Sequence, residues 1–120
     1  MDNQKAIFVV DDDQGILDSF DAIFGGNYPL VLMDNGAKAL PVIMDEKPEL
    51  LFLDIKMPGT NGLDILRRMR EMNSSTKVVI VTALPQDKYE EISSRFGVYR
   101  YLKKPLDVDE VERIAKTVLH

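Results

Sequence analysis

The sequence predicts an α/β fold in which five helices cover both faces of a doubly wound, five-stranded parallel sheet. Five short apolar runs are spread along the 120 residues. The first four are nearly continuous rather than alternating, which is typical of strands covered on both faces. Segments with helical spacing of apolar residues lie between the runs. Strand and helix therefore alternate along the whole chain, as in parallel sheets with helices on both sides.

The expected strands and helices follow one another in a regular order. Strands are expected at residues 6–10, 30–33, 50–53, 78–81 and 99–102. Helices are expected around residues 16–24, 40–44, 65–72, 89–96 and 108–118. Asp13 and Asn35 are the expected N-caps of the first two helices, and Asp107 with Glu110 forms a capping-box pattern before the last. Pro41 should kink or shorten the second helix, because it removes a backbone donor.

Length and composition indicate one domain, residues 1–120, with 45% hydrophobic residues to fill its core. The net charge of −5 argues against direct binding to nucleic acid or to anionic membranes. There is no cysteine, so disulfides and thiolate metal sites are excluded. We expect a cytoplasmic protein, since neither a signal peptide nor a bilayer-spanning run is recognisable. The single histidine, His120, is expected to be a frayed end rather than a ligand.

Reactive side chains gather where four of the predicted strands end. They are Asp11, Asp12 and Asp13 after the first strand, Asp54 after the third, Thr82 after the fourth and Lys104 after the fifth. The carboxyl ends of parallel strands share one edge of the sheet, where ligands of such folds bind. In the strand order 2-1-3-4-5, which we expect, Asp34 ends an outer strand away from the others. These side chains should therefore converge.

Each of these residues taken alone also has an ordinary structural explanation. An aspartate after a strand is often an N-cap, and a threonine there usually packs or caps. The combination argues for more, because carboxylates that meet at one edge repel each other unless a cation joins them. Oxygen ligands without histidine or cysteine point to Mg²⁺, with Mn²⁺ as an alternative.

Phosphoryl transfer is the chemistry that this set of residues suits. A carboxylate can attack phosphorus and form an aspartyl phosphate. The transferred group carries negative charge on three oxygens and needs a metal, a cation and hydrogen-bond donors around it. Asp54 would be the nucleophile, and Asp11 and Asp12 would hold the metal. Lys104 would be the cation, and Thr82 would donate its hydroxyl.

Four motifs, in order along the chain, resemble the response-regulator receiver family. They are Ile-Phe-Val-Val-Asp-Asp-Asp at 7–13, Leu-Asp-Ile-Lys-Met-Pro-Gly at 53–59, Val-Thr-Ala at 81–83 and Tyr-Leu-Lys-Lys-Pro at 101–105. The resemblance covers essentially the whole chain, and it implies a flavodoxin-like fold. It also implies that Asp12 and Asp54 bind Mg²⁺ directly, Asp11 through water, and the Lys56 carbonyl as a further ligand.

The resemblance also implies how the switch works. Phosphorylation of Asp54 would draw in the Thr82 hydroxyl and let Tyr101 move, which remodels the face formed by helix four, strand five and helix five. The Lys104–Pro105 peptide is commonly cis in this family. The positions that tune the lifetime of the phosphorylated state resemble Lys56 and Leu84, and these side chains predict slow self-dephosphorylation.

The partners expected from the resemblance are proteins. A sensor histidine kinase or a histidine phosphotransfer protein would donate the phosphoryl group. A downstream protein or an output domain would bind the helix 4–strand 5–helix 5 face. A phosphorylation-linked dimer is a further expectation. The chain would be a signalling phosphoacceptor and no enzyme in the usual sense, because it catalyses only its own phosphorylation and slow dephosphorylation.

Two alternatives remain open on the sequence. A phosphatase resembling haloacid dehalogenases would use Asp11 as nucleophile and Asp13 as acid, but it would leave Asp54 without a role. A receiver-like interaction module that is never phosphorylated would usually lose some of the residues kept here. A dinucleotide-binding fold is disfavoured, because no Gly-x-Gly-x-x-Gly follows the first strand.

Overall fold

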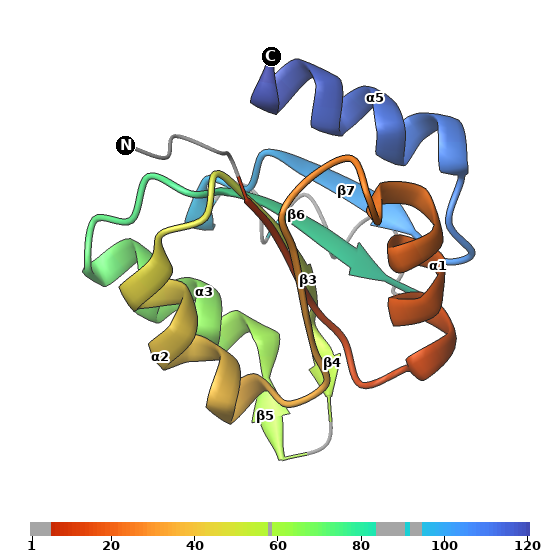
Figure 1. The fold of residues 1–120 in the computed structure, drawn as a ribbon. Coiled ribbons are helices and arrows are strands. Elements are labelled where there is room, and N and C mark those ends of the chain that lie inside the picture. The colour runs from red at the N-terminus through yellow and green to blue at the C-terminus, as the bar shows by residue number, and fades with distance from the viewer. Residues whose placement is uncertain (1–5, 58, 84–90, 92–94) are drawn as a thin grey trace.

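The computed structural model describes residues 6–57, 59–83, 91 and 95–120 (Figure 1). The strands are β1 (Ile7–Val10), β2 (Leu30–Met33), β3 (Leu50–Asp54), β4 (Lys56–Met57), β5 (Thr60–Asn61), β6 (Lys77–Thr82) and β7 (Arg100–Lys103). The helices are α1 (Gln14–Phe24), α2 (Gly36–Glu46), α3 (Gly62–Glu71) and α5 (Val108–Leu119). The fourth expected helix falls largely outside the described residues, but Arg95 and Phe96 at its end are helical.

Five parallel strands form the central sheet in the order β2-β1-β3-β6-β7. This is the predicted order 2-1-3-4-5, since β4 and β5 form a separate antiparallel hairpin. β3 lies in the middle and pairs with β1 and β6, so its last residue is enclosed by neighbouring strands. All carboxyl ends point to one edge, which carries the candidate site.

The core has two layers, one on each face of the sheet. α1 and α5 cover one face, and α2 and α3 cover the other (Figure 1). Alternate strand residues serve the two layers: Val79 and Val81 face α1 and α5, whereas Val78 and Ile80 face the opposite side. Because both faces are covered, β1, β2 and most of β3 and β6 are unbroken apolar runs in the sequence.

The helix caps agree with the predictions. The Asp13 side chain accepts from the Gly15 N–H, Asn35 accepts from the Lys38 N–H, and Asp107 accepts from the N–H groups of Asp109 and Glu110. Pro41 does not end its helix, because α2 runs through it to Glu46. Pro41 is exposed on the helix surface, where water can solvate the carbonyl that loses its partner.

Two details complete the picture at this edge. Asp54 and Thr82 are the last residues of β3 and β6, as expected, and both pair with the neighbouring strands. The segment after Asp54 contains the β4–β5 hairpin, in which Gly59 has a positive φ of 74°. This hairpin was not predicted, because its two-residue strands are too short to leave a pattern in the sequence.

Arg70, in the last turn of α3, contacts the segment that precedes β7. Its guanidinium donates to the carbonyls of Phe96 (2.7 Å), Ser74 (3.1 Å) and Gly97 (3.3 Å). Burial lowers the pKa of Arg70. One side chain thus joins the end of α3 to the segment that precedes β7.

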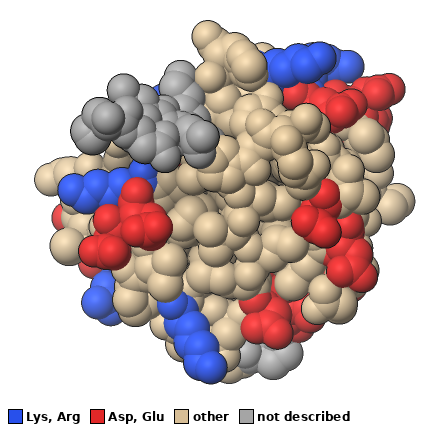
Figure 2. Space-filling view, in the orientation of Figure 1, with Lys and Arg blue, Asp and Glu red and all other residues tan. Residues whose placement is uncertain are grey.

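The surface carries charges of both signs. On the face that Figure 2 shows, Lys and Arg side chains occur in separate groups among Asp and Glu. Among the described residues, no helix is long and apolar enough to cross a bilayer. His120, expected to be a frayed end, instead lies against Tyr28, with 3.0 Å between its Nε2 and the Tyr28 hydroxyl.

Candidate functional site

Asp54 is almost enclosed at the end of the central strand. It is 4% exposed, because β1 and β6 flank β3 on both sides. The Lys56 N–H donates to its Oδ1 over 3.3 Å. This contact arises because the chain turns into the β4–β5 hairpin directly after Asp54. One carboxylate oxygen is thereby oriented by the backbone.

Asp11 and Asp12 follow β1 at the same edge. Asp11 is 1% exposed, and its Oδ1 accepts from the Asp13 N–H over 2.9 Å. Its own N–H donates to the Met33 carbonyl, so the backbone pairing with β2 continues past the strand end. Asp12 is exposed. Carboxylate oxygens of Asp11, Asp12 and Asp54 all lie within 4.8 Å of one another.

Lys104 brings a cation to these carboxylates. Its Nζ lies 3.1 Å from Oδ2 of Asp11 and 3.6 Å from Oδ2 of Asp54. The Lys104 N–H donates to the Thr82 carbonyl over 2.9 Å, which extends the β6–β7 pairing, and the peptide to Pro105 is cis. Burial by itself would lower the pKa of Lys104, but the hydrogen bond and charge of Asp11, followed by the charge of Asp54, raise it overall.

The electrostatics of the site single out Asp54. Burial, and then the charge of Asp11, raise the pKa of Asp54 to about 6. Lys104 and the Lys56 N–H oppose this shift without cancelling it, and Asp12 adds to it. Ionisation of the Asp54 side chain is therefore unfavourable unless further positive charge is present.

The residues present fit a hard divalent cation. The cluster offers three carboxylates against one ammonium, so negative charge is left over after Lys104 is counted. All three offer oxygen, the donor that Mg²⁺ prefers. A cation bound there would relieve the repulsion that raises the pKa of Asp54. The predicted metal carboxylates are thus brought together, whereas the Lys56 carbonyl remains a prediction.

The two predicted switch residues lie on neighbouring strands. Thr82 is 1% exposed at the end of β6, at the same edge as the carboxylates. Tyr101 pairs in register with Ile80, two residue pairs before the pair of Thr82 and Lys103. It packs, with Phe96 and Val98, on the core layer that α2 and α3 cover. Leu84 lies outside the described residues.

Gly62 is a site residue that the sequence reasoning missed. A Cβ at this position would collide with the Asp54 carbonyl oxygen and would lie 2.8 Å from the Ile55 Cα. The Gly62 N–H donates to the Ile55 carbonyl over 2.8 Å. The start of α3 thus rests directly on the backbone of Asp54. The only sequence signal was a glycine at the first position of a helix, which on its own is uninformative.

Comparison with known proteins gives relatives of one kind. The response regulator receiver domain family matches residues 7–116. The chain is 34% identical over 120 residues to sporulation initiation phosphotransferase F of Bacillus subtilis (strain 168), covering 99% of this chain and 96% of that protein. It is 31% identical over 116 residues to the DNA-binding transcriptional regulator NtrC of Escherichia coli (strain K12), covering 95% of this chain but 25% of NtrC.

Solved structures agree. A CheY-like response regulator receiver domain protein from Methanospirillum hungatei JF-1 superimposes with a TM-score of 0.85 at 28% identity, over 97% of this chain and 94% of that chain. The receiver domain of Francisella response regulator 1452 does so with a TM-score of 0.86 at 26% identity, over 96% of each chain. Fold, family match and relatives all point the same way: the chain belongs to the receiver domain family of two-component response regulators.

Proposed function

We propose that this receiver accepts a phosphoryl group on Asp54 from a sensor histidine kinase or a histidine phosphotransfer protein. The observation that carries the proposal is the position of Asp54. It is buried at the end of the central strand, beside the carboxylates of Asp11 and Asp12 and within 3.6 Å of the Lys104 ammonium. The residues proposed as nucleophile, metal ligands and cation thus occupy one edge of the sheet.

The transfer is an in-line displacement at phosphorus. A carboxylate oxygen of Asp54 forms the new P–O bond while the bond from phosphorus to the donor histidine nitrogen breaks, and that nitrogen keeps the electron pair. Lys104 offsets charge on the phosphoryl oxygens, and Thr82 offers a hydroxyl donor. Mg²⁺, held by Asp11, Asp12, Asp54 and the Lys56 carbonyl, would supply the remaining positive charge when bound.

The switch that follows is proposed to run through Thr82 and Tyr101. Thr82 moves toward the new phosphoryl oxygens, and Tyr101 occupies the space behind it. The register supports this route, because Tyr101 lies beside Ile80, two residues before Thr82 on β6. The face formed by helix four, β7 and α5 then changes for a downstream protein, an output domain or a second copy.

The geometry weighs against a hydrolase that uses Asp11. The Lys104 ammonium lies closer to Oδ2 of Asp11, at 3.1 Å, than to Oδ2 of Asp54, at 3.6 Å, so Asp11 is the more strongly neutralised of the two carboxylates. Asp13, which would be the acid of such an enzyme, caps α1 through the Gly15 N–H. An unphosphorylated interaction module is disfavoured too. Such a module would have no need for a cluster of carboxylates whose mutual repulsion lowers the stability of the fold.

Labelling with Mg²⁺ and a small phosphodonor such as phosphoramidate tests the proposal. We expect one phosphoryl group per chain, located on Asp54 by mass spectrometry of peptides. Asp54→Asn should abolish labelling, and Asp13→Asn is the matched control, because asparagine also caps a helix. Labelling that persists in Asp54→Asn and disappears in Asp11→Asn would establish the hydrolase instead.

A further inference from the structure

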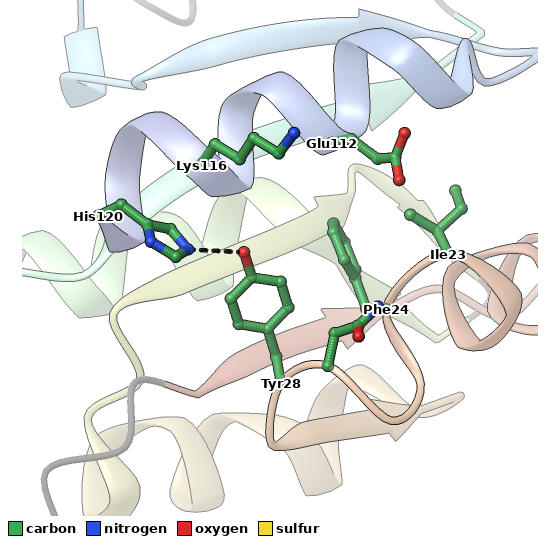
Figure 3. A pocket seen from close by; sticks show the side chains of 7 residues that line it. Ile23, Phe24, Tyr28, Glu112, Lys116 and His120 are labelled. Atoms are coloured by element: carbon green, nitrogen blue, oxygen red, sulfur yellow. Dashed lines mark hydrogen bonds between the residues drawn. The ribbon is translucent and has the colours of Figure 1, made fainter.

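A cavity of about 590 Å³ opens at the sheet edge opposite the carboxylates (Figure 3). It lies between the end of α1, the segment that leads into β2, and the carboxyl-terminal half of α5. α1 starts at the edge with the carboxylates and runs antiparallel to the strands, which places its last residues at the far edge. The volume falls within the range of small-molecule sites in proteins.

One side of this α1–α5 pocket is apolar and aromatic. Phe24 is 2% exposed, and Ile23 lies beside it. The rings of Phe24 and Tyr28 meet edge to face at 5.7 Å, and those of Tyr28 and His120 meet at 6.0 Å. The hydrogen bond between Tyr28 and His120, dashed in Figure 3, fixes the second contact. A flat apolar group would pack against the half-buried Ile23 and Tyr28, with the buried Phe24 behind them.

The opposite side carries one charge of each sign. Glu112 and Lys116 lie one turn apart on α5, and Figure 3 shows both at the pocket wall. Glutamate four residues before lysine is the favourable spacing for a helical ion pair. Yet no ion pair within 4.0 Å joins them among the described residues. Both charges are therefore available to a ligand.

We propose that the α1–α5 pocket binds a small zwitterion with a planar apolar ring, namely a free aromatic amino acid. Its ring would pack against Ile23 and Tyr28, over the buried Phe24. Its carboxylate would meet Lys116 and its ammonium would meet Glu112. A ligand with a single charge would leave one of these two groups unmatched, and an aromatic side chain within a peptide would bring neither charge.

Titration of the chain with phenylalanine, followed by amide chemical shifts, tests this binding. We expect saturable shifts confined to residues 23–28 and 112–120. Three analogues each lack part of the ligand: phenethylamine has no carboxylate, 3-phenylpropionate has no ammonium, and glycine has no ring. Phenethylamine and 3-phenylpropionate should each bind about threefold more weakly or worse, because each loses one partly exposed charge pair. Glycine should also bind more weakly, because it loses the apolar contact of the ring.

Charge-removing variants sharpen the test, and both positions are exposed, so the fold should be unaffected. Lys116→Gln should make phenylalanine and phenethylamine bind alike, and Glu112→Gln should do the same for phenylalanine and 3-phenylpropionate. Lys38→Gln and Glu46→Gln on α2 are the controls and should change neither preference.

Three results would overturn the proposal. The first is the absence of saturable shifts at the pocket. The second is equal affinity for N-acetylphenylalanine amide, which would indicate a peptide from a partner protein. The third is a set of pocket shifts that depends on protein concentration without ligand, which would indicate a second copy of the chain.

Discussion

The Lys104 ammonium lies closer to Asp11 than to the proposed acceptor, at 3.1 Å from Oδ2 of Asp11 and 3.6 Å from Oδ2 of Asp54. Without a metal, this lysine therefore balances mainly the carboxylate that is most enclosed. Its partner must change when a phosphoryl group arrives on Asp54, because the new oxygens are the stronger attraction.

Lys104→Met should reduce the stability of the metal-free protein by roughly 1 to 3 kcal/mol, because a buried carboxylate loses its charged partner. Lys103→Met, next to it and exposed, is the control. Urea unfolding in EDTA measures both. Saturating Mg²⁺ should restore a large part of the loss in Lys104→Met, since it supplies the missing positive charge. Equal midpoints for the two variants in EDTA would mean that the Lys104–Asp11 contact contributes nothing.

Asp54→Asn should stabilise the metal-free protein at neutral pH. The folded-state pKa of about 6 lies above the ordinary value of 3.8, so the fold favours the protonated acid. The stability from this group is fully present below about pH 4 and is lost as pH rises through about 6. The advantage of Asp54→Asn should thus grow from near zero at pH 4 to on the order of 2 kcal/mol above pH 6.

Urea unfolding at several pH values, in EDTA, follows this difference. Asp18→Asn removes an exposed carboxylate from α1 and is the control, for which the difference should stay small at every pH. If the difference in unfolding free energy between Asp54→Asn and the parent does not vary with pH, the pKa of Asp54 is not raised in the folded protein.

Asp12→Asn should weaken Mg²⁺ binding about tenfold or more, since the cluster would lose one of three carboxylates. Asp13→Asn removes the neighbouring charge but keeps the cap, and it should leave the affinity nearly unchanged. Isothermal titration calorimetry gives both constants. The parent affinity should also fall as pH drops below about 6, because protons then compete for Asp54. Equal affinities in the two variants would place the metal elsewhere.

Gly62→Ala should cost roughly 1 to 3 kcal/mol and slow labelling of Asp54, because the new methyl group displaces the acceptor backbone. Gly26→Ala is the control. It forces alanine into a positive φ of 88°, which Gly62→Ala does not, but it has open space around the Cβ. Its cost should come from the backbone alone, with labelling unaffected. Thermal unfolding and labelling rates separate the two effects.

Thr82→Ala should still accept phosphate on Asp54 but respond less to it. The methyl group of alanine cannot donate to the phosphoryl oxygens, so Tyr101 has no vacated space to enter. Amide chemical shifts across β7 and α5, before and after phosphorylation, report the response. Changes as large as those of the parent would mean that the signal bypasses Thr82.

The features that depend on local sequence patterns could be predicted. Five apolar runs, four of them nearly continuous, located the parallel strands, and strand order then brought Asp11, Asp12, Asp54 and Lys104 to one edge. What it missed depends on contacts between distant segments. The contact between Gly62, at the start of α3, and the Asp54 backbone forms only when α3 packs beside β3. Tyr28 and His120 are 92 positions apart, so no local pattern could predict their contact.

The three hydrogen bonds of Arg70 determine how β7 can move. They hold the carbonyls of Phe96 and Gly97 to the end of α3, just before β7 begins. The strand is thus anchored at the edge far from Asp54, while Lys104 lies at its other end. If these bonds hold while β7 shifts against β6, the displacement is smallest at this anchored end and increases toward Lys104. A small force on Lys104 from a phosphoryl group on Asp54 would therefore act at the end of β7 that is free to move most.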